Sequence, residues 1–267
     1  MVSLLAFMRK HDYLVSSYQG HSGETEFVFT GINRKDSGIE HFAFLPGGYP
    51  GEALLSSLLK DVSVISFIGS ADVAAWTDAL ARHFPHMEIT EDRDNADYLY
   101  KKEDMITLEG RQLHKKLALL QKFEAQYPDN FVVDINEAPE QDVYAVLDAW
   151  AAGKDVVEDY EAVTFMLETR HEFGLRGILL YAQQGEPVAF TLGEVDGTRI
   201  ITHVEKAIPT YQGVYQFINR AFAISLPEDI YDINREQDLG IPGLRQAKKT
   251  YQPYDFVTKY KVAARQE

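Results

Sequence analysis

The chain contains no cysteine, and this absence excludes disulfides, thiolate metal sites and a cysteine nucleophile. It fits a reducing compartment, and we expect the protein to be cytoplasmic. No apolar run approaches the roughly 20 residues that a helix needs to cross a bilayer. Residues 2–8 are apolar, but basic residues follow them instead of preceding them, so we expect neither a secretory signal nor a membrane span.

Positive charge is also scarce, and the formal net charge is −15. A general nucleic-acid coat or a membrane-surface protein is therefore disfavoured, and we expect no DNA partner. Basic residues nevertheless gather in two stretches, 111–122 and 241–267. Such local basic faces on an acidic body could bind one polyanion at a defined place.

Familiar catalytic signatures are missing as well. The sequence has no Gly-x-Ser-x-Gly elbow, no Walker loop and no zinc signature. His83 and His86 flank Pro85, and we expect no metal site there.

The 267 residues, 45% of them hydrophobic, suffice for one large domain or two ordinary ones. In the first half, short runs rich in Val, Ile, Phe and Tyr indicate strands, and helical spacing of apolar residues indicates helices. We expect strands at residues 13–18, 24–30, 39–45, 62–68, 87–90 and 97–101, and helices at 52–60 and 71–84. One long helix at residues 107–126 is predicted to connect two halves.

The second half has a clearer order. We expect a strand at 131–135, helices at 140–150 and 159–173, and an antiparallel meander of strands at 177–182, 188–195 and 200–206. A helix at 213–224, a strand at 230–233, a helix at 243–249 and a last strand at 254–262 follow. This order resembles that of the GNAT acyltransferases. We therefore expect an α+β fold of two tandem GNAT-like units, residues 1–106 and 107–267, each a mixed, mostly antiparallel sheet flanked by helices.

Several ordered blocks also resemble the C-terminal domain of bacterial phosphatidylglycerol lysyltransferases and their soluble relatives. They are LEGRQLHKK at 108–116, VAFTLG at 188–193, HVEKA at 203–207, GVYQFIN at 213–219, INREQDLG at 233–240 and GLRQAK at 243–248. The resemblance covers about residues 97–262 and implies acyl or aminoacyl transfer, with aminoacyl-tRNA as the donor in characterised relatives. Since the membrane-spanning half of the lipid-modifying enzymes is missing, a small-molecule or peptide-like acceptor is expected in place of a lipid.

In a GNAT-like sheet the strands 200–206 and 230–233 are parallel neighbours that splay apart, and the helix 213–224 crosses between them. Strand ends at such a crossover form the usual ligand crevice. Polar residues reach it from both strands. Glu205, Glu236 or Asp238 could accept the proton of an attacking amine or bind the ammonium of an aminoacyl donor. Lys206, Arg245 or Lys248 could face a developing oxyanion or a phosphate.

The expected site therefore has three groups of residues. The candidate catalytic residues are Glu205, Lys206, Glu236 and Asp238. The candidate substrate-binding residues are His203, Gln212, Gly213, Asn234, Arg235, Arg245, Lys248 and Tyr251. The candidate tRNA-binding residues are Arg111, Lys115 and Lys116, which can cluster on one side of a helix.

Other functions stay open at this point. No cofactor is required, although coenzyme A is a possible donor. The run at 211–215 opens a helix but lacks the glycine-rich pattern of acetyl-CoA-dependent relatives. The third alternative is a non-catalytic member of the fold that binds a ligand or a partner. The charges themselves also have a plainer interpretation, as a structural network that links Glu205 or Glu236 to Arg245 or as a solvated helix face.

Overall fold

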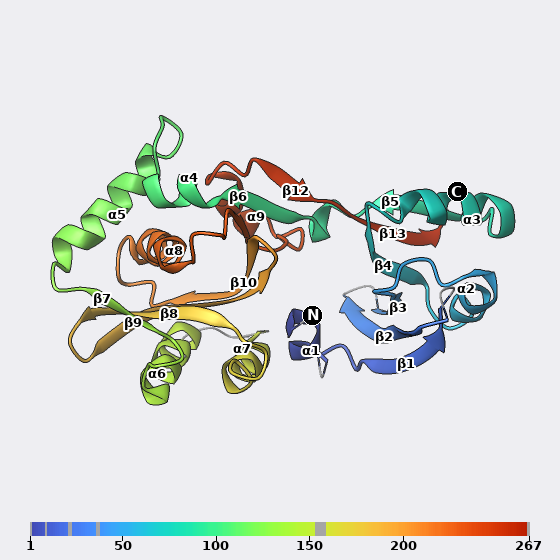
Figure 1. The fold of residues 1–267 in the computed structure, drawn as a ribbon, viewed down its shortest axis with the longest axis horizontal. Coiled ribbons are helices and arrows are strands. Elements are labelled where there is room, and N and C mark those ends of the chain that lie inside the picture. The colour runs from blue at the N-terminus through green and yellow to red at the C-terminus, as the bar shows by residue number, and fades with distance from the viewer. Residues whose placement is uncertain (1, 9, 21–22, 36–37, 153–158, 266–267) are drawn as a thin grey trace. The chain divides into compact units, whose positions relative to one another are not determined.

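The computed structural model describes residues 2–8, 10–20, 23–35, 38–152 and 159–265. The chain forms two compact units (Figure 1). The N-terminal unit comprises Phe7–Ala96 and Val257–Glu267, and the C-terminal unit comprises Met1–Ala6 and Asp97–Phe256. Each unit has its own sheet and its own core.

The N-terminal unit is a six-stranded sheet with the order β1-β2-β3-β4-β13-β5. Leu55 and Trp76, from the two helices, pack against the sheet residues Ile65 and Val262 in its core. The strands are β1 (Leu14–Gln19), β2 (Thr25–Lys35), β3 (Gly38–Phe44), β4 (Val64–Gly69), β5 (Met87–Glu91) and β13 (Lys259–Ala264), and the helices are α2 (Glu52–Leu58), α3 (Val73–His83) and the 3-10 turn η1 (Arg93–Asn95).

The predicted last strand at 254–262 is wrong as a single strand. It divides into β12 (Asp255–Val257) and β13, which belong to different sheets. In β13, Val262 pairs with Ile65 of β4 and with Ile89 of β5, and it is fully buried. The end of the chain therefore completes the N-terminal unit, whereas we expected it in the C-terminal one.

The C-terminal unit is a seven-stranded sheet with the order β12-β6-β11-β10-β9-β8-β7. Its other strands are β6 (Asp97–Lys101), β7 (Phe131–Asp134), β8 (Arg176–Gln183), β9 (Glu186–Asp196), β10 (Arg199–Ala207) and β11 (Asp232–Asn234). Its helices are α1 (Val2–Ala6), α4 (Lys102–Thr107), α5 (His114–Gln126), α6 (Glu140–Ala151), α7 (Tyr160–Glu168), α8 (Val214–Ser225) and α9 (Pro242–Lys249).

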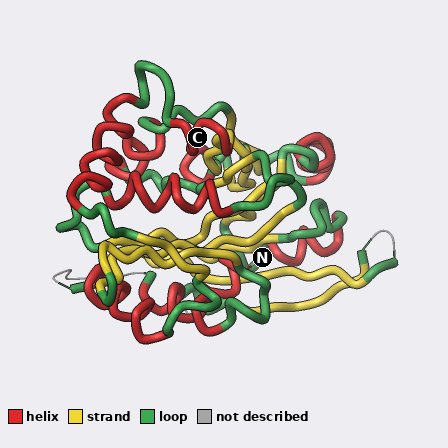
Figure 2. The backbone as a smooth tube through the Cα atoms, turned by 60° about the vertical axis from the view of Figure 1, so that its left-hand side comes forward, coloured by secondary structure: helices red, strands yellow, loops and turns green. Residues whose placement is uncertain are grey.

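Helices cover both faces of this sheet (Figures 1 and 2). On one face α5 and α8 bury Phe123 and Ile218. On the other, α6 and α7 bury Leu147 and Met166 against Phe190 of β9. Such a three-layer arrangement leaves the ends of the central strands as the places where polar side chains can gather.

The centre of the sheet has the predicted topology. Strands β8, β9 and β10 form the antiparallel meander, and β11 pairs with β10 in parallel after the crossing helix α8. Beyond β11 lies β6, which pairs with it antiparallel. We expected β6 in the unit of residues 1–106 and the last strand in the unit of residues 107–267. The C-terminal unit instead includes β6 and excludes β13, so it differs from the expected unit at both ends.

The predicted long helix at 107–126 is also wrong, because residues 108–113 at its start are not helical. Helix α4 ends at Thr107 and α5 begins at His114. Leu108 and Gly110, with φ angles of 49° and 95°, take left-handed conformations that an α-helix cannot continue through.

Candidate active site

The candidate site lies where the parallel strands β10 and β11 part. Their pairing stops at Ile201 and Asn234, after which β10 continues to Ala207 while the other chain segment turns away at Arg235. Arg235 reaches back and donates from Nη2 to both carboxylate oxygens of Glu205, at 3.2 and 3.1 Å. Both side chains are mostly buried. The predicted convergence of the two polar segments is therefore present.

Aromatic rings and a second cation surround this ion pair. The guanidinium carbon of Arg235 lies 5.0 Å from the ring centroid of Tyr251 and 5.8 Å from that of Tyr100. Lys116 of α5 places Nζ 4.4 Å from the same Tyr251 centroid. Burial, and then the charge of Arg235, lower the pKa of Lys116. Positive charge is thus concentrated around one buried tyrosine.

Two donors in this cluster have no acceptor. Nη1 of Arg235 and the hydroxyl of Tyr251 are buried, and neither makes a hydrogen bond of good geometry among the described residues, although Gln216 and Arg235 lie close enough to the hydroxyl to favour its deprotonated form. Burial raises the pKa of Tyr251 to about 12, with Arg235 opposing the shift, so the phenol stays a donor at neutral pH. Buried polar atoms normally find partners, and unpaired ones mark a place where a ligand or water atom belongs.

The loop after β11 is held in place by Lys248 of α9. Its Nζ donates to the carbonyl oxygens of Arg235, Glu236 and Gln237 at 2.6, 3.1 and 2.6 Å. Burial, together with the charge of Arg235, lowers the pKa of Lys248 to about 8. The carbonyl of Lys248 in turn accepts a hydrogen bond from Tyr100 at 2.8 Å. Lys248 therefore shapes the loop and directs its ammonium to the backbone.

Asp238 anchors the other end of that loop. It is fully buried and accepts hydrogen bonds from Tyr98 (2.5 Å), the Gly240 amide (2.9 Å) and two nitrogens of Arg245 (2.9 and 2.6 Å). Burial alone would raise the pKa of this carboxyl, but the bonds from Arg245 and Tyr98 hold it well below its usual range. Such a carboxylate is a poor proton acceptor, so its geometry fits a structural role better than the expected catalytic one.

Asn234 likewise supports the loop. Its Oδ1 accepts the Glu236 amide at 2.7 Å, and its Nδ2 donates to Asp97 of β6 at 3.0 Å. This Asx turn accommodates the left-handed conformation of Glu236, whose φ is 52°. The side-chain amide of Asn234 thus fixes the backbone of Glu236 and orients this residue.

Glu236 meets His203, whose imidazole is held between two glutamates. Nδ1 lies 2.9 Å from an oxygen of Glu236, and Nε2 lies 3.3 Å from an oxygen of Glu194. Burial lowers the pKa of His203, but the two carboxylates outweigh this and raise it to about 9. A β-bulge between Thr202 and Val204 breaks the strand alternation at this histidine. His203 is therefore a cation at neutral pH and a poor base.

Lys206 lies apart from this cluster. Its Nζ sits 2.5 Å from Asp159 at the start of α7 and 3.5 Å from the ring centroid of Trp150 in α6. These helices cover the opposite face of the sheet from α8. Burial lowers the pKa of Lys206. The structure thus does not bring this expected catalytic residue to Glu205.

The remaining candidates divide into surface and packing positions. Gly213, with a φ of 90°, begins α8, and a Cβ there would lie 2.1 Å from the carbonyl oxygen of Leu119. Only glycine fits, for a reason of packing. Gln212 is exposed. Of the three candidate tRNA-binding residues, Arg111 and Lys115 are exposed, and only Lys116 turns to Tyr251.

Sequence reasoning missed the contributions of β6 and of Glu194. Tyr98 and Tyr100 both point to the loop and α9, as their bonds to Asp238 and Lys248 show. Their alternate positions in a strand were a signal that they share a face. They were overlooked because β6 was expected in the other unit.

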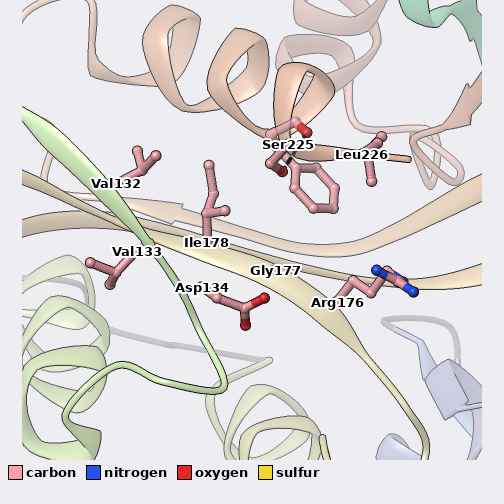
Figure 3. A pocket seen from close by; sticks show the side chains of 9 residues that line it. Val132, Val133, Asp134, Arg176, Gly177, Ile178, Ser225 and Leu226 are labelled. Atoms are coloured by element: carbon pink, nitrogen blue, oxygen red, sulfur yellow. Dashed lines mark hydrogen bonds between the residues drawn. The ribbon is translucent and has the colours of Figure 1, made fainter. Parts of the chain in front are cut away.

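A small cavity of about 170 Å³ lies elsewhere in the C-terminal unit (Figure 3). Arg176 and Asp134 line it from β8 and β7, and Ser225 from the end of α8. Arg176 pairs with Gly193, two residues along β9 from Thr191, which is the partner of Glu205 in β10. None of the residues that line this cavity belongs to the candidate site.

No helix among the described residues is both long and apolar enough to cross a membrane. Within the same described ranges, no group of three or more His, Cys, Asp or Glu side chains is arranged to hold a metal ion.

The parallel pair β10 and β11, the crossing helix α8 and the repetition of this plan in two units define a tandem GNAT-like fold. Residues 54–263 match the family described as "Phosphatidylglycerol lysyltransferase, C-terminal", and the chain belongs to this family. The predicted family and fold are thus confirmed.

Solved structures agree with this assignment. A conserved protein of unknown function from Bacteroides thetaiotaomicron is 28% identical, with a TM-score of 0.78 over 99% of this chain and 90% of that one. L-PGS from Bacillus licheniformis is 14% identical, with a TM-score of 0.58 over 99% and 91% of the two chains. A tandem GNAT protein from the clavulanic acid biosynthesis pathway is 10% identical, with a TM-score of 0.52 over 98% and 87%.

No curated protein sequence matches this chain significantly. Family and fold together indicate a protein of the acyl- and aminoacyltransferase type.

Proposed function

We propose that the protein transfers an aminoacyl group from aminoacyl-tRNA to the amine or hydroxyl of a small or peptide-like acceptor, at the point where β10 and β11 part. The observation that carries this proposal is the Glu205–Arg235 ion pair, because it places a carboxylate and a cation at the strand ends where the fold gathers ligands. The family resemblance supplies the donor class.

Aminolysis of an ester needs a proton acceptor for the attacking amine. Asp238 is saturated with hydrogen bonds, and Glu236 is bound to the cationic His203. Glu205 is the carboxylate that remains, held in one orientation by Arg235 and part-exposed. We propose that Glu205 accepts a proton from the attacking amine as the new C–N bond forms, and then returns a proton to the ester oxygen of the donor as the C–O bond breaks and the tRNA hydroxyl departs.

Among the cations expected at the developing oxyanion, Lys206, Arg245 and Lys248 are bound to Asp159, Asp238 and backbone carbonyls, respectively. Arg235 is the cation beside Glu205. The exposed Arg111 and Lys115, close in sequence to Lys116, extend positive charge from this cluster to the surface of the C-terminal unit. This arrangement suits the phosphate backbone of a donor tRNA.

The test is a transfer assay with charged tRNA. The protein is incubated with a mixture of aminoacyl-tRNAs and a small-molecule and peptide acceptor mixture, and loss of the aminoacyl ester and new amide or ester products are followed by mass spectrometry. We expect ester loss faster than in buffer and abolished by Glu205→Gln. Ester loss equal to that in buffer, for every tRNA, would refute the proposal.

The same substrates also distinguish the proposed function from two alternatives. An acyl-CoA-dependent transferase would acylate the acceptor mixture with acetyl-CoA and leave aminoacyl-tRNA untouched. A non-catalytic member would bind a ligand without consuming either donor, and Glu205→Gln would then leave the cellular phenotype intact.

A further inference from the structure

The ring of Tyr251 is the centre of a set of hydrogen-bond donors that have no acceptors. Lys116 approaches it from α5, and Arg235 from the loop after β11, with their charged groups 4.4 and 5.0 Å from the ring centroid. The Tyr251 hydroxyl and Arg235 Nη1 are buried and unpaired among the described residues. Lys116 forms no ion pair with an acidic side chain in that part of the chain. Three donor groups from distant segments thus meet without an acceptor.

From this juxtaposition we propose that Lys116, Arg235 and Tyr251 form a phosphate-binding site beside Glu205. This inference deepens the proposed function, on which it rests for the identity of the donor, because it assigns these side chains to a phosphate group of the donor substrate. Lys116 supplies an ammonium, Arg235 its free Nη1 and Tyr251 its hydroxyl. A tetrahedral phosphate offers acceptors to all three at once.

The charges of the cluster favour an anion. Lys116, Arg235 and Lys248 bring three cations, whereas Glu205 brings one carboxylate, and Glu236 is already bound to His203. Burial and Arg235 depress the pKa of Lys116, which means that its charged form is disfavoured while the site holds no anion. A bound phosphate offsets that penalty, because its negative charge stabilises the buried ammonium and neutralises the repulsion between the two cations.

The position of the site also fits a donor substrate. Arg235 bonds to Glu205 through Nη2 and keeps Nη1 for another acceptor. A phosphate held there lies next to the carboxylate that receives the proton of the acceptor. Both possible donors carry phosphates. The phosphate at the 3′ end of a tRNA lies close to the aminoacyl ester, whereas the phosphates of coenzyme A are one pantetheine arm away from the thioester. The shared chemistry is a phosphate, and the experiment must separate the two sources.

The unpaired hydroxyl of Tyr251 makes the proposal testable without destabilising the fold. Tyr251→Phe keeps the ring against Tyr100 and Lys116 and removes only an oxygen that makes no hydrogen bond of good geometry within the described ranges. Removing an unsatisfied buried group is neutral or stabilising, so the thermal midpoint should not fall. A loss of phosphate affinity in such a variant then reports on ligand contact alone.

The experiment measures binding of inorganic pyrophosphate, 5′-AMP, the trinucleotide CCA and coenzyme A by isothermal titration calorimetry, with no acceptor present. We expect Lys116→Met to weaken phosphate binding roughly ten- to a hundredfold and Tyr251→Phe roughly two- to tenfold. Lys122→Met is the matched control, since this exposed lysine on the same helix should change affinity less than about twofold.

The outcomes separate the two proposals. If no probe binds, or if every probe binds the wild type, Lys116→Met and Tyr251→Phe with equal affinity, the phosphate site is refuted whatever the transfer assay shows. Variant-sensitive binding of AMP and CCA supports the site and a tRNA donor. Variant-sensitive binding of coenzyme A alone supports the site and refutes the tRNA donor. Variant-sensitive binding without any transfer leaves the phosphate site standing and refutes the proposed reaction.

Discussion

Arg235 binds Glu205 through a single guanidinium nitrogen, which donates to both carboxylate oxygens at 3.2 and 3.1 Å. This contact joins β10 to the segment after β11 just beyond the last backbone pairing of the two strands. It orients the carboxylate and leaves the second guanidinium nitrogen available. The predictions below separate the groups at this junction that act on a substrate from those that hold the junction together.

Glu205→Gln should lower the rate of aminoacyl transfer by a factor of about 10² to 10⁴, because the amide cannot accept the proton of the attacking amine. The substitution keeps the size of the side chain, and one oxygen still accepts from Arg235. Single-turnover transfer with charged tRNA measures the rate. Binding of the phosphate probes should change much less than the rate, and an unchanged rate would remove Glu205 from the mechanism.

Lys206→Met should leave the transfer rate within about threefold of the wild type, since this lysine contacts Asp159 and Trp150 and not the Glu205 cluster. The aliphatic chain of methionine keeps the contact with the indole ring. The same single-turnover assay, at a temperature well below the thermal midpoint, measures the rate. A loss as large as that of Glu205→Gln would restore the catalytic role expected from the sequence.

The stability of the protein should fall between pH 6.5 and about 9 as His203 loses its proton. The pKa of His203 is raised from 6.5 to about 9 in the folded state, so its stabilising effect is complete below pH 6.5 and is lost as pH rises through 9. The loss is at most about 3 kcal/mol. Urea denaturation across this range measures it.

Glu194→Gln is the matched variant for that measurement. It removes one of the two carboxylates that raise the pKa of His203 in the folded state. The decline in stability should therefore still begin near pH 6.5, but it should be smaller and end at a lower pH. A profile that is identical to that of the wild type would show that the imidazole is not held between the two glutamates.

Asp238→Asn should lower the free energy of unfolding by about 2 to 4 kcal/mol, because Arg245 and Tyr98 then lose a fully buried anionic acceptor. Urea denaturation at pH 7 measures this change. Asp229→Asn, at an exposed position before β11, should shift stability by less than about 0.5 kcal/mol. Equal effects of the two substitutions would contradict the anchoring role of Asp238.

Much of the C-terminal sheet could be predicted from the sequence. The alternation of apolar residues and the tight turns specify the β8–β10 meander, and the element order places α8 between two parallel strands. Local patterns do not say which sheet receives a strand. The segment 97–101 was correctly predicted to be a strand, and part of the predicted last strand forms β13. The partners of both strands nevertheless lie far away in the sequence.

The meeting of Glu205 with the loop after Asn234 was also predictable, because it follows from that topology. The separate roles of the individual charged residues could not be predicted. Asp238 and Lys248 become supports through Tyr98 and through three backbone carbonyls, which no spacing reveals. Lys116 shares a helical face with the buried Leu120 and Phe123, whereas Lys115 does not, but the contact of Lys116 with Tyr251 joins segments far apart in the sequence.

The insertion of β13 between β4 and β5 has a consequence for biosynthesis. The N-terminal sheet lacks an internal strand until residues 259–264 have been translated, so β4 and β5 each keep the backbone edge that pairs with β13 unpaired until then. Exposed edges of this kind invite aggregation, and pairing across nearly two hundred residues closes slowly. A ribosome-stalled chain that ends before Lys259 should accordingly bind chaperones, and proteases should cut it within the first ninety residues. A released chain that includes residues 259–264 should have those ninety residues protected in one step.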